Sequence, residues 1–265
     1  QRNDLDAEAS EALRSLIPAL ADGKARINGS VTADFANSRL TVALQDFWQR
    51  WPKAIALAGN SLTLGILPRQ PSADFGQDLP FWLVFPFCEG KYRAKWGMAF
   101  TEHLSFDFGG TIPASDLLAE AQRPLVAVLP AEWYAQTGAL GPLAVPAQKQ
   151  FALWDTFVAG GFTAYMKDKE RAREYGYFNY GDWFGERGRN WGNNEYDLAH
   201  GLFLQFARTG DREFYRWALT AARHQADVDC VHAYPDPYYV GANHQHSIGH
   251  TGTWSQDPEH ATWSF

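Results

Sequence analysis

Cysteine is scarce in this chain, and its cationic residues are not clustered. Only two cysteines, Cys88 and Cys230, occur among 265 residues. Two thiols in different halves of the chain do not form a disulfide framework and indicate no redox compartment. We expect buried free thiols, with a single bridge as the alternative. The formal net charge is −7, and no block of Lys and Arg is present to neutralise phosphates. We therefore expect no nucleic-acid partner.

Long apolar runs are also absent. No stretch approaches the roughly 20 apolar residues that a membrane-spanning helix needs, so we expect no membrane insertion. The sequence shows no signal peptide, and it begins at Gln1 instead of an initiator Met. We expect a mature form or a piece of a longer protein.

Aromatic residues, in contrast, are abundant. They make up 15% of the chain, with 11 Trp and 11 Tyr, in a composition that is 46% hydrophobic and only 20% charged. These values are typical of a globular protein. Flat aromatic faces are what sugar-binding sites use, although an aromatic-packed core explains most of such residues.

The hydrophobic pattern divides the chain into two halves. Residues 5–21 have helical spacing, and from about residue 26 to 108 the period changes to two, with Gly, Pro, Asn and Asp between the runs. This alternation predicts an antiparallel β-sandwich. A helix near 115–122, a strand at PLVAVLP (124–130) and a helix starting at Pro130 follow. We place an N-terminal helical segment at 1–24 and the sandwich at 25–145.

Helical spacing dominates after Gln148. The first long helix, FALWDTFVAGGFTAYMKDKERAREY, ends in a run of charges that we interpret as solvated. The next helix is expected to stop at Gly210, and Asp211 is expected to cap the one after it. Paired helices whose functional-looking polar residues always lie at the same type of helix–helix connection are typical of an α/α toroid. The predicted fold class is therefore α+β multidomain: an antiparallel β-sandwich, then part of an α/α toroid at 146–265.

Two loops of the helical half contain the residues suited to chemistry. The later loop contains His244, His246 and His250 in the pattern H-x-H-x3-H, which suits an acid/base role. A Zn²⁺ or Ca²⁺ site is the alternative, although Gly residues interrupt the run and no Cys is near. Our prediction is that no cofactor is bound.

The earlier loop, GDWFGERGRNWGNNEYD, spans residues 181–197. Arg187 is a planar two-pronged donor that suits a carboxylate. Asp182 or Glu186 with Glu195 or Asp197 would provide the carboxylate pair of a glycoside hydrolase. Alternatively, Glu195 and Asp197 cap the following helix and Glu186 pairs with an Arg. Trp183 and Trp191 are candidate sugar platforms, or they roof the loop.

Together these residue types suggest β-elimination at a uronate. That reaction needs the carboxylate neutralised, a base such as His or Tyr, and an acid for the leaving oxygen. We assign His246 or Tyr239 as base, His250 as acid and Arg187 with Lys95 as carboxylate partners. Lys95 lies on a predicted strand with Lys91 and Arg93, for which a solvated edge is the alternative. The candidate substrate-binding residues are Lys95, His103, Trp183, Glu186, Trp191, Asn193, Asn194 and His244.

Five segments also resemble a known family. TVALQDFWQRWPKAI, KWGMAFTEHLSFDF, LPAEWYAQTGALGPL, YGDWFGERGRNWGNNEYD and HSIGHTG, in that order, are similar to the exo-rhamnogalacturonan lyases (polysaccharide lyase family 26). The resemblance implies a RIFT barrel, a β-sandwich and an α/α toroid. It also implies a secreted or periplasmic enzyme that acts on rhamnogalacturonan or ulvan. Here the barrel and most of the toroid are missing, so a homo-oligomer or second chain is expected to complete the toroid. The implied site residues are His246, His250, Arg187 and the GDWFGER loop.

Three functions follow from these patterns. The first is a lyase that cleaves an acidic polysaccharide or oligosaccharide. The second is a glycoside hydrolase that uses acids of the 182–197 loop. The third is a noncatalytic glycan-binding or structural piece that needs a partner chain, because an incomplete toroid exposes apolar helix faces.

Overall fold

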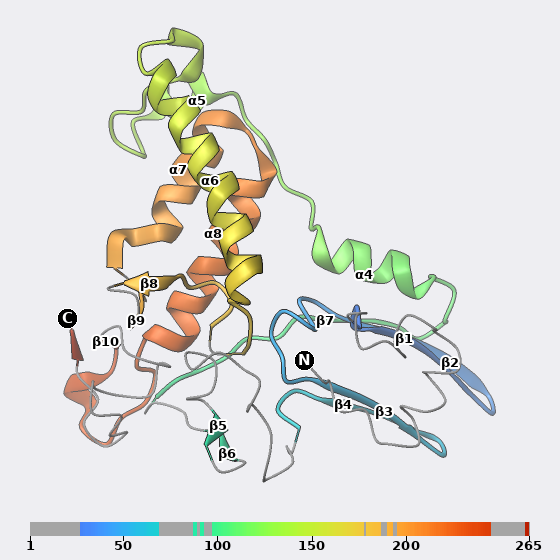
Figure 1. The fold of residues 1–265 in the computed structure, drawn as a ribbon. Helices are drawn as coiled ribbons and strands as arrows, with labels where there is room; N and C mark the ends of the chain where they lie inside the picture. Colours follow the sequence, from blue (N-terminus) through green and yellow to red (C-terminus); the bar gives the residue numbers. More distant parts are fainter. Residues whose placement is uncertain are drawn as a thin grey trace. The chain divides into compact units, whose positions relative to one another are not determined.

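A computed structural model describes residues 27–68, 87–88, 91–92, 97–177, 179–186, 190–192, 195–244 and 263–264. The chain divides into two compact units. It passes from one unit to the other at several points, which include 78/79, 100/101 and 125/126. The first unit contains the strands β1–β4 and β7 with helix α4, and the second contains helices α5–α8 (Figure 1). The predicted helix at 5–21 lies outside the described residues.

Antiparallel strands form the first unit. Strands β1 (Ser30–Phe35), β2 (Ser38–Leu44) and β7 (Leu104–Asp107) make one sheet in the order β1-β2-β7. Strands β3 (Ala54–Ala58) and β4 (Ser61–Gly65) form a hairpin. Its turn includes Gly59, whose φ of 56° is easily adopted by glycine, as its turn signal predicts. Strands β5 (Phe87–Cys88) and β6 (Lys91–Tyr92), of two residues each, pair with one another.

The two sheets of the first unit share one hydrophobic core. Alternate residues of β2 point to opposite faces, as strand geometry requires. Val42 and Leu44 face a cluster with Phe47, Ile55 and partly buried residues of β4. Ala43 faces the other way, against Leu117 and Leu118 of helix α4 (Ala114–Gln122). The predicted α+β class is therefore confirmed, with the antiparallel sheets preceding the helical part.

One predicted strand is wrong. Residues 124–130 form no strand, and the Leu125 side chain is fully exposed. Pro124 and Pro130 have no backbone N–H to donate to a sheet, which explains the lack of pairing. Helix α5 (Ala131–Thr137) then begins where expected, with Pro130 as its N-cap.

Three longer helices build the second unit, together with short 3₁₀ turns. They are α6 (Ala152–Ala172), α7 (Leu198–Thr209) and α8 (Arg212–His224). Gly210 ends α7 with φ of 70°, and the Asp211 side chain accepts a hydrogen bond of 2.9 Å from Glu213 N. Both helix boundaries confirm the sequence prediction. No helix in the described part of the chain combines the length and apolar content needed to cross a membrane.

Aromatic packing joins these helices. The rings of Phe206 and Tyr215 connect α7 to α8, with 4.9 Å between their centroids. Phe162 of α6 contacts Phe214 of α8 at 4.4 Å. The high aromatic content thus contributes to a packed helical core, one of the two roles considered for it.

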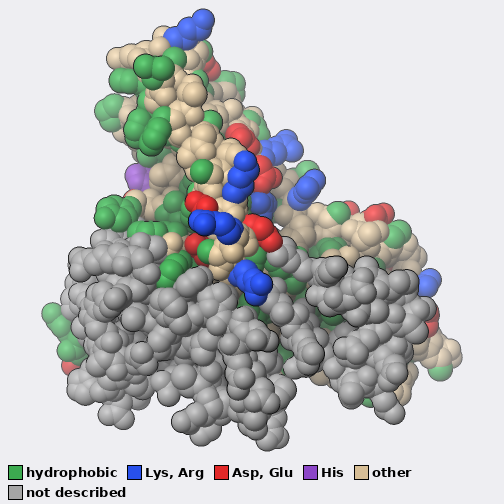
Figure 2. Space-filling model, in the orientation of Figure 1, with side chains coloured by type: hydrophobic (Ala, Val, Ile, Leu, Met, Phe, Trp, Pro, Cys, Tyr) green, Lys and Arg blue, Asp and Glu red, His purple; other side chains and the backbone are tan. Residues whose placement is uncertain are grey.

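Helix α6 also has an exposed apolar face. Leu153, Trp154 and Phe157 are 89%, 55% and 68% exposed, respectively. Figure 2 shows hydrophobic side chains gathered around the upper part of this helical region and charged side chains along the lower part. Apolar side chains at these spacings lie on one side of a helix.

The exposure of this face can be tested by making the same substitution, Phe to Leu, at an exposed and at a buried position. Phe157→Leu is expected to change the free energy of unfolding by less than about 0.5 kcal/mol, because exposed side chains contribute little. Phe206→Leu is expected to cost about 1 to 2 kcal/mol, because the Phe206 side chain is only 7% exposed. Urea unfolding of the 265-residue chain measures both. Equal costs would show that a second copy or another part of the chain covers α6.

Candidate functional site

The loop that the sequence singled out spans residues 181–197, and α8 positions its first residue, Gly181. Gly181 has φ of +113°, and a Cβ added there would lie 2.4 Å from Thr220 O and 2.7 Å from His224 Cβ. Only glycine allows the backbone to approach α8 so closely. The chain then forms strands β8 (Phe184–Glu186) and β9 (Asn190–Trp191). We call residues 181–192 the Trp183 loop.

Trp183 is a partly exposed aromatic residue of this loop. The N–H of Gly192 donates to Trp183 O at 2.9 Å, and a Cβ on Gly192 would lie 2.0 Å from the indole atom Cε2. The indole therefore packs directly on the glycine backbone. Tyr196 lies beside it, with 5.9 Å between the ring centroids, and is 80% exposed. The two ring planes are tilted by 41°, and an exposed aromatic ring is the kind of apolar surface that a sugar ring can stack on.

The second predicted platform is wrong. Trp191 is fully buried, and its ring packs against Phe184 with 5.4 Å between centroids. A stacking platform needs an open face, which Trp191 does not have. Tyr196 was not among the predicted site residues. Its signal in the sequence was an aromatic residue among polar neighbours just before a helix.

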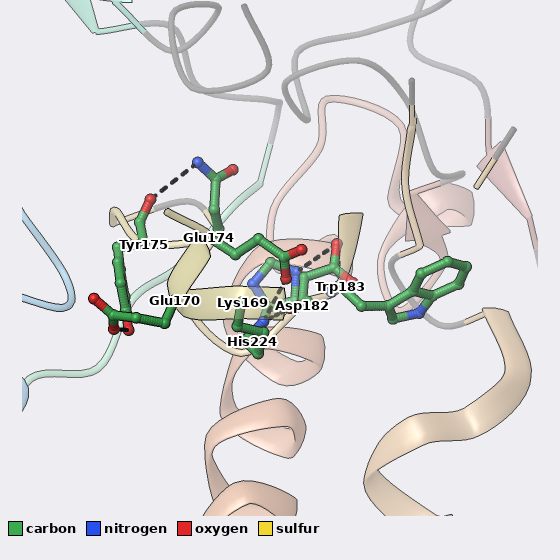
Figure 3. A network of polar contacts seen from close by, with 8 residues as sticks. Lys169, Glu170, Glu174, Tyr175, Asp182, Trp183 and His224 are labelled. Carbon is green, nitrogen blue, oxygen red and sulfur yellow. Dashed lines mark hydrogen bonds and ion pairs between the residues drawn. The ribbon is translucent and has the colours of Figure 1, made fainter. Parts of the chain in front are cut away.

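Buried charges lie on the other side of the Trp183 loop. The Lys169 ammonium, from the last turn of α6, donates to Glu174 Oε2 at 2.9 Å and to the backbone carbonyl of Asp182. It also lies 5.0 Å from the Tyr165 ring centroid and 5.6 Å from that of Trp217. Figure 3 shows Lys169, Glu174 and Asp182 close together, with the Trp183 side chain extending to one side of them.

His224 joins the same cluster from the end of α8. Its Nε2 lies 3.4 Å from Asp229 Oδ1 and 3.6 Å from Asp182 Oδ2. A π-helical turn, η3 (Gln225–Asp229), follows α8 and returns Asp229 to the side of His224, five residues earlier. We call Lys169, Glu174, Asp182, His224 and Asp229 the buried charge network. Each of these residues is less than about a tenth exposed.

The buried charge network shifts the pKa values of His224 and Lys169. Burial lowers the pKa of His224, but the carboxylates of Asp229 and Asp182 raise it more, so the net pKa lies above its ordinary value. Burial also opposes the charge of Lys169, yet Tyr165 and Glu174 raise the pKa of its ammonium above the ordinary value. The carboxylates near each group therefore favour its charged form.

Three sequence interpretations need correction here. The charged run at the end of α6 is not wholly solvated, because Lys169 is 1% exposed and Glu174 is 4% exposed. Asp182 is 1% exposed, with Oδ1 accepting from Trp183 N at 2.7 Å, so it does not face solvent as a hydrolase acid must. Asp197 occupies the N-cap of α7 but forms no side-chain cap bond; it lies 3.0 Å from His200 Nδ1 instead.

Tyr239 belongs to a group of three tyrosines around the turn η4 (Pro237–Tyr239). Its ring lies 5.0 Å from that of Tyr234 and 5.4 Å from that of Tyr238, both edge to face. Asp236 caps the turn by accepting from Tyr238 N at 3.0 Å. The turn therefore holds the Tyr239 ring in place, and its assignment as a base stays a prediction.

Several predicted site residues lie outside the described residues. They are Lys95, Arg187, Asn193, Asn194, His246 and His250. Glu186 and His244 lie in β8 and β10 (Asn243–His244), but their side chains are not among those described. His103 belongs to the first unit and is exposed, with its carbonyl accepting from Gln45 N at 3.1 Å.

Metal binding was the alternative use of the imidazoles. Among the described side chains, no group of three or more His, Cys, Asp and Glu is arranged to hold an ion. His246 and His250 lie outside the described residues. The prediction of no cofactor and its Zn²⁺ or Ca²⁺ alternative remain predictions.

These features define a class of protein. A unit of paired helices holds a loop rich in aromatic and charged residues, after a region of small antiparallel sheets. Residues 124–259 match the family model described as the PcRGLX-like protein C-terminal alpha/alpha toroid domain. The chain therefore belongs to this rhamnogalacturonan lyase-like family. The match confirms the family-level resemblance noted in the sequence.

A relative in the curated proteins is similar along most of the chain. The uncharacterized protein YetA of Bacillus subtilis (strain 168) is 24% identical over 260 residues, which cover 86% of this chain and 29% of YetA. The chain thus spans less than a third of the relative's length.

Proposed function

We propose that this chain is part of a polysaccharide lyase that cleaves a uronate-containing polysaccharide of the rhamnogalacturonan type by β-elimination. The observation that carries the proposal is the match of residues 124–259 to the toroid domain of a lyase-like family. The Trp183 and Tyr196 rings, which lie within that range, supply an exposed aromatic surface of the kind that binds sugars.

The proposed reaction removes the proton next to a uronate carboxylate. The bond between the sugar carbon and the leaving oxygen then breaks, and a carbon–carbon double bond forms. Arg187 and Lys95 would neutralise the uronate carboxylate, His246 or Tyr239 would take the proton, and His250 would protonate the leaving oxygen. No water is consumed, so the product carries a conjugated unsaturated uronate.

The hydrolase alternative has less support. Asp182 faces His224 in the interior, and the Asp197 carboxylate is beside His200. Two carboxylates that flank a sugar bond must both reach solvent. The burial of Asp182 therefore favours a supporting role for this acid over direct catalysis.

The proposal is tested by measuring unsaturated products. The chain is incubated with rhamnogalacturonan and with ulvan, with and without a chelator, and with a neutral galactan as the control polysaccharide. The expected result is rising absorbance from conjugated unsaturated uronate with an acidic substrate only. Cleavage that gives saturated products would contradict β-elimination.

Trp183→Ala tests the aromatic surface. Loss of one stacking ring is expected to lower kcat/KM, or affinity for an oligosaccharide, by about fivefold, since such contacts contribute about 1 kcal/mol. Trp154→Ala is the matched control, because Trp154 is also partly exposed but lies on α6. Isothermal titration and initial rates measure both variants. Equal losses in the two would remove Trp183 from the site.

A further inference from the structure

Asp182 connects the buried charge network to the Trp183 loop. Its backbone carbonyl accepts from Lys169, its Oδ1 accepts from Trp183 N at 2.7 Å, and its Oδ2 faces His224 Nε2 at 3.6 Å. The Trp183 indole points away from these charges (Figure 3). The backbone of Asp182 and Trp183, which orients the indole, is therefore held by hydrogen bonds to buried charged groups.

A proton on His224 places a positive charge next to two carboxylates of the network. Three carboxylates, from Glu174, Asp182 and Asp229, share this interior with the Lys169 ammonium. The protonated imidazole adds a positive charge to this interior, close to the Asp182 and Asp229 carboxylates, and loss of the proton removes that charge. Opposite charges attract more strongly in a buried site than in water, so Asp182 is held most firmly when His224 is protonated.

We propose that His224 is a positioning residue whose proton holds Asp182 in place and thereby orients Trp183 for binding an acidic glycan. The identity of the ligand rests on the function proposed above, whereas the positioning itself does not. The loop is expected to be tight at low pH and looser at high pH, although His224 contacts neither the substrate nor the solvent.

The direction of the pH effect follows from the charged groups that act on His224. Among the described residues these are Asp229 from the π-helical turn, Asp182 from the loop and Lys169 from α6. Burial and the Lys169 ammonium lower the pKa of His224, but the Asp229 and Asp182 carboxylates raise it more, so it lies above its ordinary value of about 6.5. The stabilisation is then fully present below about pH 6.5 and is lost as the pH rises through the raised pKa.

Amide hydrogen exchange of the Trp183 loop tests the proposal without any ligand. The N–H groups of Trp183 and Gly192 are the probes, because the first donates to Asp182 and the second to Trp183 O. After correction for intrinsic exchange, protection in the wild type should fall about tenfold for each unit by which folding raises the pKa of His224. His224→Gln is neutral at every pH, so its protection should be flat and should meet the wild-type value at high pH.

A merely structural role for His224 gives a different result. Its loss would lower protection by the same factor at every pH, and that outcome would overturn the proposal. Asp229→Asn is the second variant, because it keeps the shape of the side chain and removes one raising charge. It should shift the wild-type pH dependence to lower pH. Arg208→Gln, which breaks a buried pair with Asp155 away from the loop, should keep the wild-type pH dependence.

Glycan titrations separate this proposal from the proposed function. Affinity for a rhamnogalacturonan oligosaccharide should fall with pH in the wild type and stay low and flat in His224→Gln. Loop protection that depends on His224, without glycan binding, would support positioning and contradict the function. Glycan binding with loop protection that does not depend on His224 would support the function and refute positioning.

Discussion

Replacing Lys169 by Met is expected to lower the free energy of unfolding by about 3 to 5 kcal/mol at pH 7. The substitution removes the ammonium that donates to Glu174 and to the backbone carbonyl of Asp182. Glu174 is only 4% exposed, so its carboxylate stays buried without the Lys169 cation. Breaking one side of a buried ion pair costs more than the pair contributes, because the remaining charge is desolvated.

Two further variants show whether charge is the cause. Lys167→Met is the matched control on the same helix, and because Lys167 is exposed it should change stability by less than about 0.5 kcal/mol. The double variant Lys169→Met with Glu174→Gln should recover part of the loss, because it also removes the uncompensated carboxylate. Guanidinium unfolding measures all three. A double variant that is no more stable than Lys169→Met would show that lost packing, not charge, is responsible.

Gly181→Ala is expected to cost about 3 kcal/mol and to displace the Trp183 loop from α8. A φ of +113° is strained for Ala, and the new Cβ would lie 2.4 Å from Thr220 O. Both groups near that Cβ belong to a packed helix, so the loop must move instead. The displacement should also weaken glycan binding, because Trp183 follows two residues later.

Gly160→Ala is the control for this prediction. Gly160 lies inside α6, and nothing lies within 4 Å of a Cβ added there. Ala is the better helix former, so this variant should gain about 0.5 to 1 kcal/mol. Thermal unfolding gives the stabilities, and exchange of the Trp183 amide reports on the loop. A neutral Gly181→Ala with a fully protected loop would show that α8 does not restrain it.

Most elements of the fold can be predicted from the sequence because they depend on local patterns. Period two around Val42 and Leu44 predicts β2, and helical spacing predicts α6, α7 and α8. Gly210 and Asp211 end one helix and begin the next through contacts within a few residues. The strand predicted at 124–130 fails because two prolines remove the donors that pairing needs.

The candidate site is only partly predictable, because burial is a property of the whole unit. The sequence identifies the 181–197 loop and Trp183, but not that Trp191 is buried and Tyr196 is exposed. Both are aromatic residues between polar neighbours, and only packing against Phe184 distinguishes Trp191 from Tyr196.

The sequence by itself therefore determined the α+β class, the helix boundaries, the family and the loop that carries Trp183. Tertiary structure alone decided which charges are withdrawn from water. Lys169 and Glu174 stand in a run of charges that resembles a solvated helix end, and Asp182 resembles an exposed loop acid. Asp182 and Lys169 are 42 and 55 positions from His224 along the chain. They meet His224 next to the Trp183 loop because α6, α8 and Gly181 pack closely there. No local pattern records that convergence, because it arises from contacts between distant segments.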